Sequence, residues 1–153
     1  MRCGPDVVFL DPGELRDADL ILRLSRRAPA DASKRLAASY WFELIVEGVA
    51  VGTLNLRLDD SPEVEMFDGH LGYTVYPKFR GRRYALRACR LVLPLARAHG
   101  LMTLWITCHP ENHASRRTCE GLGAVFVEIV HRPRGGDMCV EGEDVKCRYR
   151  LEV

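Results

Sequence analysis

The sequence has no apolar run long enough to span a membrane and no excess of charge of one sign. Near its start, the run Val7–Leu10 is too short for the core of a signal peptide. Lys plus Arg number 22 and Asp plus Glu number 21, so the net charge is +1. Such a balance draws a protein neither to nucleic acid nor to a membrane surface. We therefore expect a cytoplasmic protein with no nucleic-acid and no membrane partner.

The six cysteines lack the spacing of a disulfide framework or of a zinc site. There is no CxxC pair, and without a secretory signal the cysteines should be reduced thiols. Cys108, His109 and His113 are close in sequence, but His109 should precede the helix that carries His113. Since no second ligand pair has zinc spacing either, we expect no metal.

Two phosphate-binding patterns are also missing. Neither GxxxxGK followed by Ser or Thr nor GxGxxG occurs, which excludes a P-loop and a Rossmann fingerprint. Repeats, low-complexity tracts and linkers are absent as well. With 153 residues, 47% of them hydrophobic, the chain suits one compact domain. We expect a single domain over 1–153, in which residues 1–18 are an N-terminal extension.

Hydrophobic patterning predicts a fold of the α/β (α+β) class. Antiparallel strands should come first, then one parallel strand–helix–strand crossover, then an antiparallel hairpin. The segment 26–39 should hold a loop with a short helix, and the acidic segment 59–68 a solvated loop. The predicted strands are 19–25, 40–46, 49–58, 69–76, 101–108, 124–131 and 145–153, and the predicted helices are 84–99 and 112–122.

The segment KFRGRRYA, residues 78–85, connects a strand to a helix and gathers positive charge around Gly81. A loop in this position exposes unpaired backbone N–H groups at the positive end of the helix dipole, which together bind phosphate. Gly81 allows the backbone to approach a ligand closely, and small Ala85 leaves room beside the first helical turn. The segment therefore predicts a site for a pyrophosphate, with an ordinary basic turn as the alternative.

The region 69–124 resembles the core of the GCN5-related N-acetyltransferases (GNAT family). The family signature is a strand, a turn of the form R/Q-x-x-G-x-G/A and a helix, and Arg80, Arg83 and Ala85 occupy its first, fourth and sixth positions. The fourth position is usually glycine. Arg83 is compatible with binding if its φ is negative, and its side chain would either crowd the phosphate or form a salt bridge with it.

A second segment, which begins at Asn112 and continues to Gly123, is similar to the family pattern N-x-x-A/S-x-x-x-Y-x-x-x-G-F. With the order of elements, the resemblance extends over 19–153. It implies a mixed, mostly antiparallel central sheet with helices on both faces, and acetyl-CoA as co-substrate. The cofactor-binding residues that it implies are Tyr73, Thr74, Val75, Arg80, Gly81, Arg82, Arg83, Tyr84, Ala85, Asn112 and Ser115.

The resemblance implies direct attack of an amine on acetyl-CoA in a ternary complex. Such a reaction needs positioning, a base for the ammonium proton and an acid for the departing thiolate. Relatives use a tyrosine acid where this chain has Cys119, whose thiol could serve as the acid or only pack in the core. His70 and Glu43 are the candidate bases, and the alternatives are solvent water or no dedicated base.

The predicted function is acetyl-CoA-dependent N-acetylation of a primary amine on a small molecule, a protein N-terminus or a lysine. The alternatives are an enzyme for a longer acyl-CoA, a non-catalytic acyl-CoA sensor, and an RNA-binding module built on a stripe of arginines. Family members commonly have two helices between the first two strands, and only 26–39 is available here. We therefore expect an open amine site, which a homodimer would complete. The arginine stripe of the RNA-binding alternative consists of Arg83, Arg87, Arg90 and Arg97.

Overall fold

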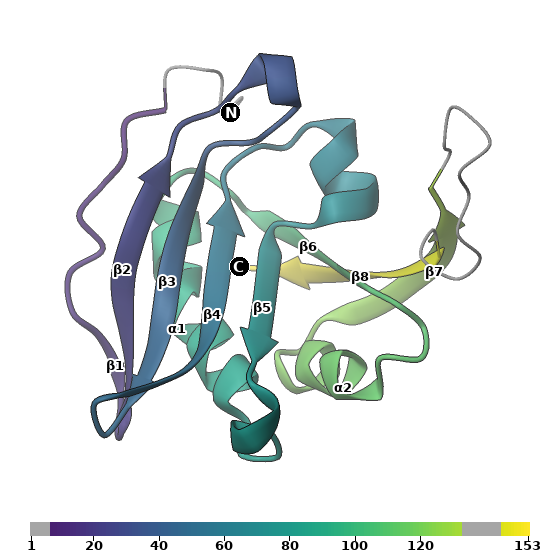
Figure 1. Ribbon diagram of the computed structural model, residues 1–153. Coiled ribbons are helices and arrows are strands. Elements are labelled where there is room, and N and C mark those ends of the chain that lie inside the picture. The colour runs from purple at the N-terminus through teal and green to yellow at the C-terminus, as the bar shows by residue number, and fades with distance from the viewer. Residues whose placement is uncertain (1–6, 133–144) are drawn as a thin grey trace.

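The computed structural model describes residues 7–132 and 145–153, and in this part of the chain eight strands form two antiparallel sheets (Figure 1). The larger sheet has the order β1-β2-β3-β4-β5 and the smaller has the order β6-β8-β7. The strands are β1 (Leu15–Asp17), β2 (Leu20–Ala28), β3 (Ser39–Val46), β4 (Val49–Arg57), β5 (Leu71–Val75), β6 (Thr103–Cys108), β7 (Val125–His131) and β8 (Val145–Glu152).

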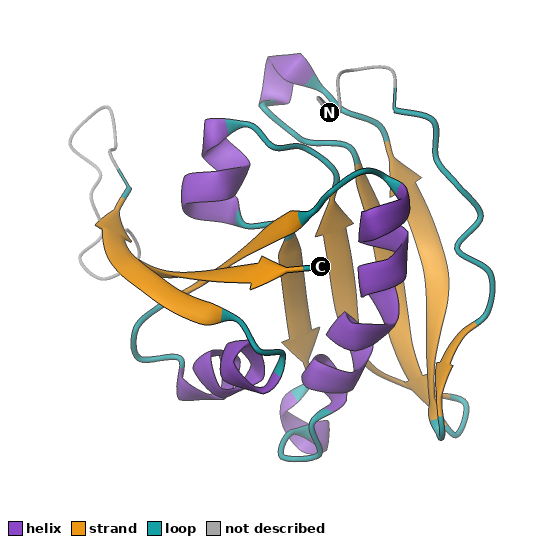
Figure 2. Cartoon of the chain, turned by 180° about the vertical axis from the view of Figure 1, so that it is seen from behind, coloured by secondary structure: helices purple, strands orange, loops and turns teal. Residues whose placement is uncertain are grey.

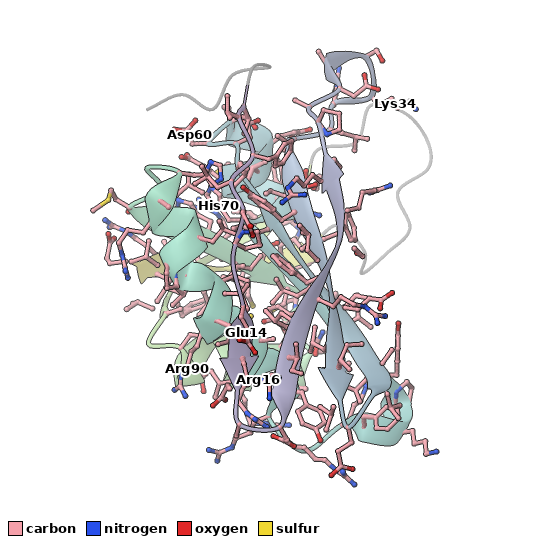
Figure 3. The ribbon with its side chains drawn as sticks, turned by 90° about the vertical axis from the view of Figure 1, so that its left-hand side faces the viewer. Glu14, Arg16, Lys34, Asp60, His70 and Arg90 are labelled. Atoms are coloured by element: carbon pink, nitrogen blue, oxygen red, sulfur yellow. The ribbon has the colours of Figure 1, made fainter. Side chains whose placement is uncertain are left out.

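Helix α1 (Tyr84–Ala98) packs across one face of the five-stranded sheet, as seen from behind in Figure 2 and edge-on in Figure 3. The strands alternate, so that Leu22, Phe42 and Leu54 point toward this helix and form the core with it. The face of α1 toward the sheet carries small side chains, among them the fully buried Ala88. Small residues such as Ala88 let the helix lie close to the sheet, and larger ones such as Val92 and Leu95 pack into the core beside them.

Helix α2 (His113–Gly121) lies beside the three-stranded sheet (Figure 2). Asn112 caps it, because its Oδ1 accepts a hydrogen bond from the N–H of Ser115 at 3.1 Å. The predicted hairpin of the last two strands is confirmed, and β8 lies between β6 and β7.

The expected succession of strand, helix and strand is present as β5, α1 and β6, but β5 and β6 do not pair. Each strand pair within 7–132 and 145–153 is antiparallel, and the sheet divides between these two strands (Figure 1). One backbone hydrogen bond of the described residues links them at the start of β5, from His70 N to Trp105 O at 2.7 Å. Beyond it the strands diverge, and this gap replaces the expected parallel pair.

Three segments differ from, or refine, the sequence-based prediction. Strand β1 lies within the predicted N-terminal extension. Part of the expected acidic loop forms a short π-helical turn, η2 (Val64–Asp68), because Val64 is buried. The short helix expected within 26–39 is present as η1 (Ala32–Lys34).

The structure describes four of the six cysteines. The described cysteines, all free and buried, are Cys89, Cys108, Cys119 and Cys147. Cys3 and Cys139 lie outside the described residues. No helix within 7–132 or 145–153 is long and apolar enough to cross a membrane. The same residues contain no cluster of three or more potential metal ligands.

Candidate functional site

The gap between β5 and β6 is closed at one end by His70. Its backbone N–H donates to Trp105 O, and its Nδ1 accepts a hydrogen bond from Trp105 N at 2.8 Å. Thr107 Oγ1 also donates to Phe67 O at 2.7 Å. Burial lowers the pKa of His70 from 6.5 to about 4. The imidazole is therefore neutral at physiological pH and joins the two sheets.

Past His70, the backbone of β5 faces the gap at every second residue. Arg57 N donates to His70 O at 2.7 Å, so the antiparallel register turns the backbone groups of Gly72 and Thr74 toward β4. Those of Tyr73 and Val75 face the gap instead. Main-chain hydrogen bonds to a ligand are thus available from alternate residues of β5.

The turn after β5 leads directly into α1. The short helix η3 (Pro77–Phe79) ends at Arg80, whose Nε donates to Val75 O at 3.0 Å. Gly81 has φ +86°, and a Cβ there would meet no atom within 4 Å. No side chain caps the start of α1, so the first N–H groups of the helix keep their hydrogen-bonding capacity.

Arg83 adopts the left-handed conformation that its glycine position requires. Its φ is +59°, not the negative value on which the sequence-based interpretation depended. The turn therefore keeps the backbone path of a glycine at the steric cost of a side chain. That side chain is exposed, so it does not fill the cleft.

All the residues predicted to bind the cofactor line one cavity of about 820 Å³, which opens between β5, the turn and α2. Additional lining residues come from α2, where Ala114, Arg117, Thr118 and Gly121 share one helical face. Their spacing was visible in the sequence and could have identified them. The exposed arginines of the turn make one end of this cavity positive, whereas Tyr73 and Ser115 lie at the other end.

A second cavity of about 380 Å³ adjoins the first. Tyr73, Asn112 and Ser115 line both cavities. The sequence did not reveal the second cavity, because its residues come from separate elements that only the folded chain brings together. Its further described lining residues are Arg57, Phe67, Asp68, Leu71, Gly72, Thr107, Cys108, His109, Arg132 and Lys146.

Four polar side chains meet at the junction of the two cavities and directly behind it. The hydroxyl groups of Tyr73 and Ser115 lie 2.8 Å apart, and Tyr73 Oη lies 3.8 Å from Cys119 Sγ. Hydrogen bonding from Cys119 lowers the pKa of Cys108, helped by Ser115 and by the positive charge of Arg116. The same Cys108–Cys119 contact, together with burial, raises the pKa of Cys119.

The predicted acid and bases do not all reach these cavities. Cys119 is fully buried behind Tyr73 and lines neither cavity. His70 is 1% exposed, and its Nδ1 is occupied by a backbone N–H. Glu43, on β3, forms an ion pair with Arg23 away from both cavities. The structure thus gathers the cofactor residues but separates His70 and Glu43 from them.

The arginine stripe on α1 is partly engaged within the protein. Arg87 bonds to the carboxylates of Asp17 and Asp19 at 2.7 and 2.6 Å. Arg90, which projects from the side of α1 away from the sheet (Figure 3), donates to Gly121 O at 3.0 Å. These contacts give two of the arginines a structural role and weaken the RNA-binding hypothesis.

The sequence matches the family described as "Acetyltransferase (GNAT) domain" over residues 1–125. None of the curated proteins matches it. Among solved structures, the microcin C7 self-immunity acetyltransferase MccE, in complex with acetyl-CoA and AMP, is 14% identical with a TM-score of 0.58. That alignment covers 75% of this chain and 61% of MccE.

Two further structures have the same fold. RimL, a ribosomal L7/L12 alpha-N-protein acetyltransferase in complex with coenzyme A, is 13% identical (TM-score 0.58), with 75% of this chain and 62% of RimL covered. A GNAT-family acetyltransferase from Bacillus anthracis is 22% identical (TM-score 0.55), with 73% and 65% covered. This chain therefore spans less than two thirds of the length of these relatives.

Proposed function

We propose a function from one premise: this chain belongs to the GNAT acetyltransferase family. The proposed reaction transfers an acetyl group from acetyl-CoA to a primary amine of a small molecule, a protein N-terminus or a lysine. One observation carries the proposal most strongly. The family's phosphate-binding turn and its asparagine segment, which are far apart in the sequence, line the same 820 Å³ cavity.

The residues of this cavity suit two parts of a coenzyme A molecule, the diphosphate and the pantetheine arm. The uncapped start of α1 and the backbone around Gly81 offer N–H groups to a diphosphate, and Arg80, Arg82 and Arg83 add positive charge. The backbone of Tyr73 and Val75 would pair with the amides of the pantetheine arm, as an added strand would. Acetyl-CoA supplies the activated acetyl group, and the chain supplies position and proton transfer.

The second cavity is the proposed site of the amine. It adjoins the first at Tyr73, Asn112 and Ser115, where the acetyl group would arrive. In this cavity Asp68 or Cys108 could receive the ammonium proton, directly or through water. His70 is buried and Glu43 pairs with Arg23 away from the cavity, so we do not propose either residue as the base. A screen of amines for the acceptor should include ones that carry a carboxylate, because Arg57, Arg132 and Lys146 line the cavity.

Calorimetric titration with acetyl-CoA tests the proposal on wild type, Gly81→Asp and Gly123→Asp. Both glycines have φ +86°, and a Cβ at either would meet no atom within 4 Å, so the backbone strain is matched. Of these two glycines, Gly81 lines the 820 Å³ cavity and Gly123 does not. We expect wild type and Gly123→Asp to bind and Gly81→Asp to lose about 100-fold in affinity, since a carboxylate would face the diphosphate. No binding by wild type at millimolar acetyl-CoA would refute the proposal.

A non-catalytic acyl-CoA sensor is the second candidate, favoured by the absence of a tyrosine at position 119. It predicts the same calorimetry but no loss of thioester absorbance when primary amines are added. An enzyme for a longer acyl-CoA would bind and consume butyryl-CoA better than acetyl-CoA. These two assays separate the three functions.

A homodimer, a cytoplasmic location and a single domain over 1–153 stay predictions. Exposed apolar side chains on β7, which include Val125 (66% exposed) and Ile129 (49%), support the homodimer. Sedimentation of wild type and of Val125→Lys would test it. The dimer hypothesis predicts a dimer that the charged variant dissociates.

A further inference from the structure

We propose that Tyr73 is the general acid of this protein: its hydroxyl delivers a proton to the sulfur of coenzyme A as the acetyl group leaves. This inference rests on the proposed function and adds a residue to it. It assigns the acid to a strand residue on the β5 side of the cleft, not to α2, where the family pattern carries a tyrosine and this chain carries Cys119.

The hydroxyl of Tyr73 is held where the two cavities join. Tyr73 lines both cavities, so its side chain borders the passage from the diphosphate turn to the amine site. Its Oη lies 2.8 Å from Ser115 Oγ and 3.4 Å from Ser115 O. Because these contacts fix the phenol at the junction, the donor has one defined position before any ligand binds.

The hydroxyl of Tyr73 also lies close to Cys119. Tyr73 Oη lies 3.8 Å from Cys119 Sγ, so a phenol reaches the neighbourhood of position 119 from the opposite wall. Cys119 itself is fully buried and lines neither cavity. A larger side chain at position 119 would compete with the Tyr73 ring for space. The small cysteine is therefore what allows Tyr73 to reach across the cleft.

The protonation state of Tyr73 suits an acid. Burial raises the pKa of its phenol, so the group keeps its proton at neutral pH. The same burial disfavours a bare thiolate, so the departing sulfur gains from receiving a proton as the carbon–sulfur bond breaks. Ser115 Oγ lies 2.8 Å from the phenol oxygen and can then stabilise the phenolate by donating a hydrogen bond to it.

The proton balance closes without any further reactant. Nitrogen of the amine forms a bond to the acetyl carbon, the carbon–sulfur bond breaks, and its electron pair goes to sulfur. Tyr73 gives its O–H proton to that sulfur and takes a proton from Ser115. Ser115 regains one through water in the second cavity, where the amine has released its own.

A binding cycle tests the contact between phenol and sulfur without an acceptor amine. Calorimetry at pH 9 would compare coenzyme A with desulfo-coenzyme A, which lacks the sulfur, on wild type and on Tyr73→Phe. At this pH much of the thiol is ionised. For each protein the measured quantity is the ratio of its affinities for coenzyme A and for desulfo-coenzyme A. We expect this ratio to be about tenfold larger for wild type than for Tyr73→Phe, because the variant loses a charge-assisted hydrogen bond to the sulfur. Tyr76→Phe, which changes an exposed tyrosine outside both cavities, should behave as wild type.

Turnover gives the second readout, with acetyl-CoA and glycinamide followed by thioester absorbance. Tyr73→Phe should lower kcat about 100-fold while the Kd for acetyl-CoA changes by less than about threefold. Tyr73→His, which puts a donor back, should recover part of the rate. A purely structural role would instead change the melting temperature and Kd together.

Each outcome has one meaning. If wild type binds neither ligand, the proposed function fails and this inference fails with it. If wild type and Tyr73→Phe bind coenzyme A with the same preference over desulfo-coenzyme A, the contact with sulfur is refuted while cofactor binding stands. An unchanged kcat in Tyr73→Phe would likewise refute Tyr73 as the acid.

Discussion

The two ends of β5 lie in opposite surroundings, although they are only a few residues apart. At the start, His70 is 1% exposed and joins the two sheets through Trp105. Toward Val75, the strand borders a cavity of about 820 Å³ and leads into a turn of exposed arginines. One end is therefore buried and linked to the second sheet, and the other is exposed, positively charged and open to a ligand.

This difference shows how a binding cleft is made from an ordinary strand. β5 pairs with β4 along its whole length, so the open end does not lack support. Its other edge loses its partner because β6 turns away past Trp105. The hydrogen-bonding capacity that a neighbouring strand would have used is then available to a ligand. Three experiments compare what the residues at each end contribute to the stability of the fold.

Removing the imidazole at the closed end should have the largest effect. His70→Ala leaves the N–H of Trp105 without its acceptor and creates a cavity, so we expect the free energy of unfolding to fall by about 3 to 4 kcal/mol. His70→Asn is the matched control, because its Oδ1 can accept the same hydrogen bond. Denaturant unfolding would measure both. Equal losses in the two variants would mean that the hydrogen bond contributes little.

Lowering the pH should have the second-largest effect, a loss of the stability that neutral His70 contributes at the closed end. The folded-state pKa of His70 is about 4 and its ordinary value is 6.5, so the unfolded chain binds the proton first as the pH falls. The stability from a neutral His70 is present above pH 6.5 and is lost between about pH 6.5 and 4, in total about 3 kcal/mol. The stability difference between wild type and His70→Asn should shrink over this range. A constant difference would contradict a neutral buried imidazole.

Replacing Arg83, in the turn at the open end, by glycine should have the smallest effect on stability. Arg83→Gly removes a side chain from a residue with φ +59°, and we expect a gain of about 0.5 kcal/mol in the free energy of unfolding. Arg82→Gly is the control, since Arg82 has no positive φ and glycine there should destabilise by a similar amount. Thermal unfolding would measure both. The same sign in both variants would mean that φ at position 83 costs nothing.

The parts of the site that depend on local sequence were predictable. A strand, a glycine turn and a helix lie within one stretch of chain, so the position of Gly81 at the cavity followed from the pattern. The roles given to His70 and Glu43 depended instead on where each strand faces after the sheet divides. A pattern of alternating residues contains no information about that division. The second cavity was hidden for the same reason, because residues such as Arg57 and Cys108 meet only in the folded chain.

Within 7–132 and 145–153, one backbone hydrogen bond, at His70, links β5 to β6, so the width of the gap depends on how the two sheets are rotated about this point. From His70 to Val75 the strand extends about 17 Å, at about 3.3 Å per residue. A rotation of about 5° between the sheets around that link would move Val75 by about 1.5 Å relative to β6, which is half a hydrogen-bond length. The stiffness of the contacts around His70 would therefore set how accurately the open end of β5 holds a ligand.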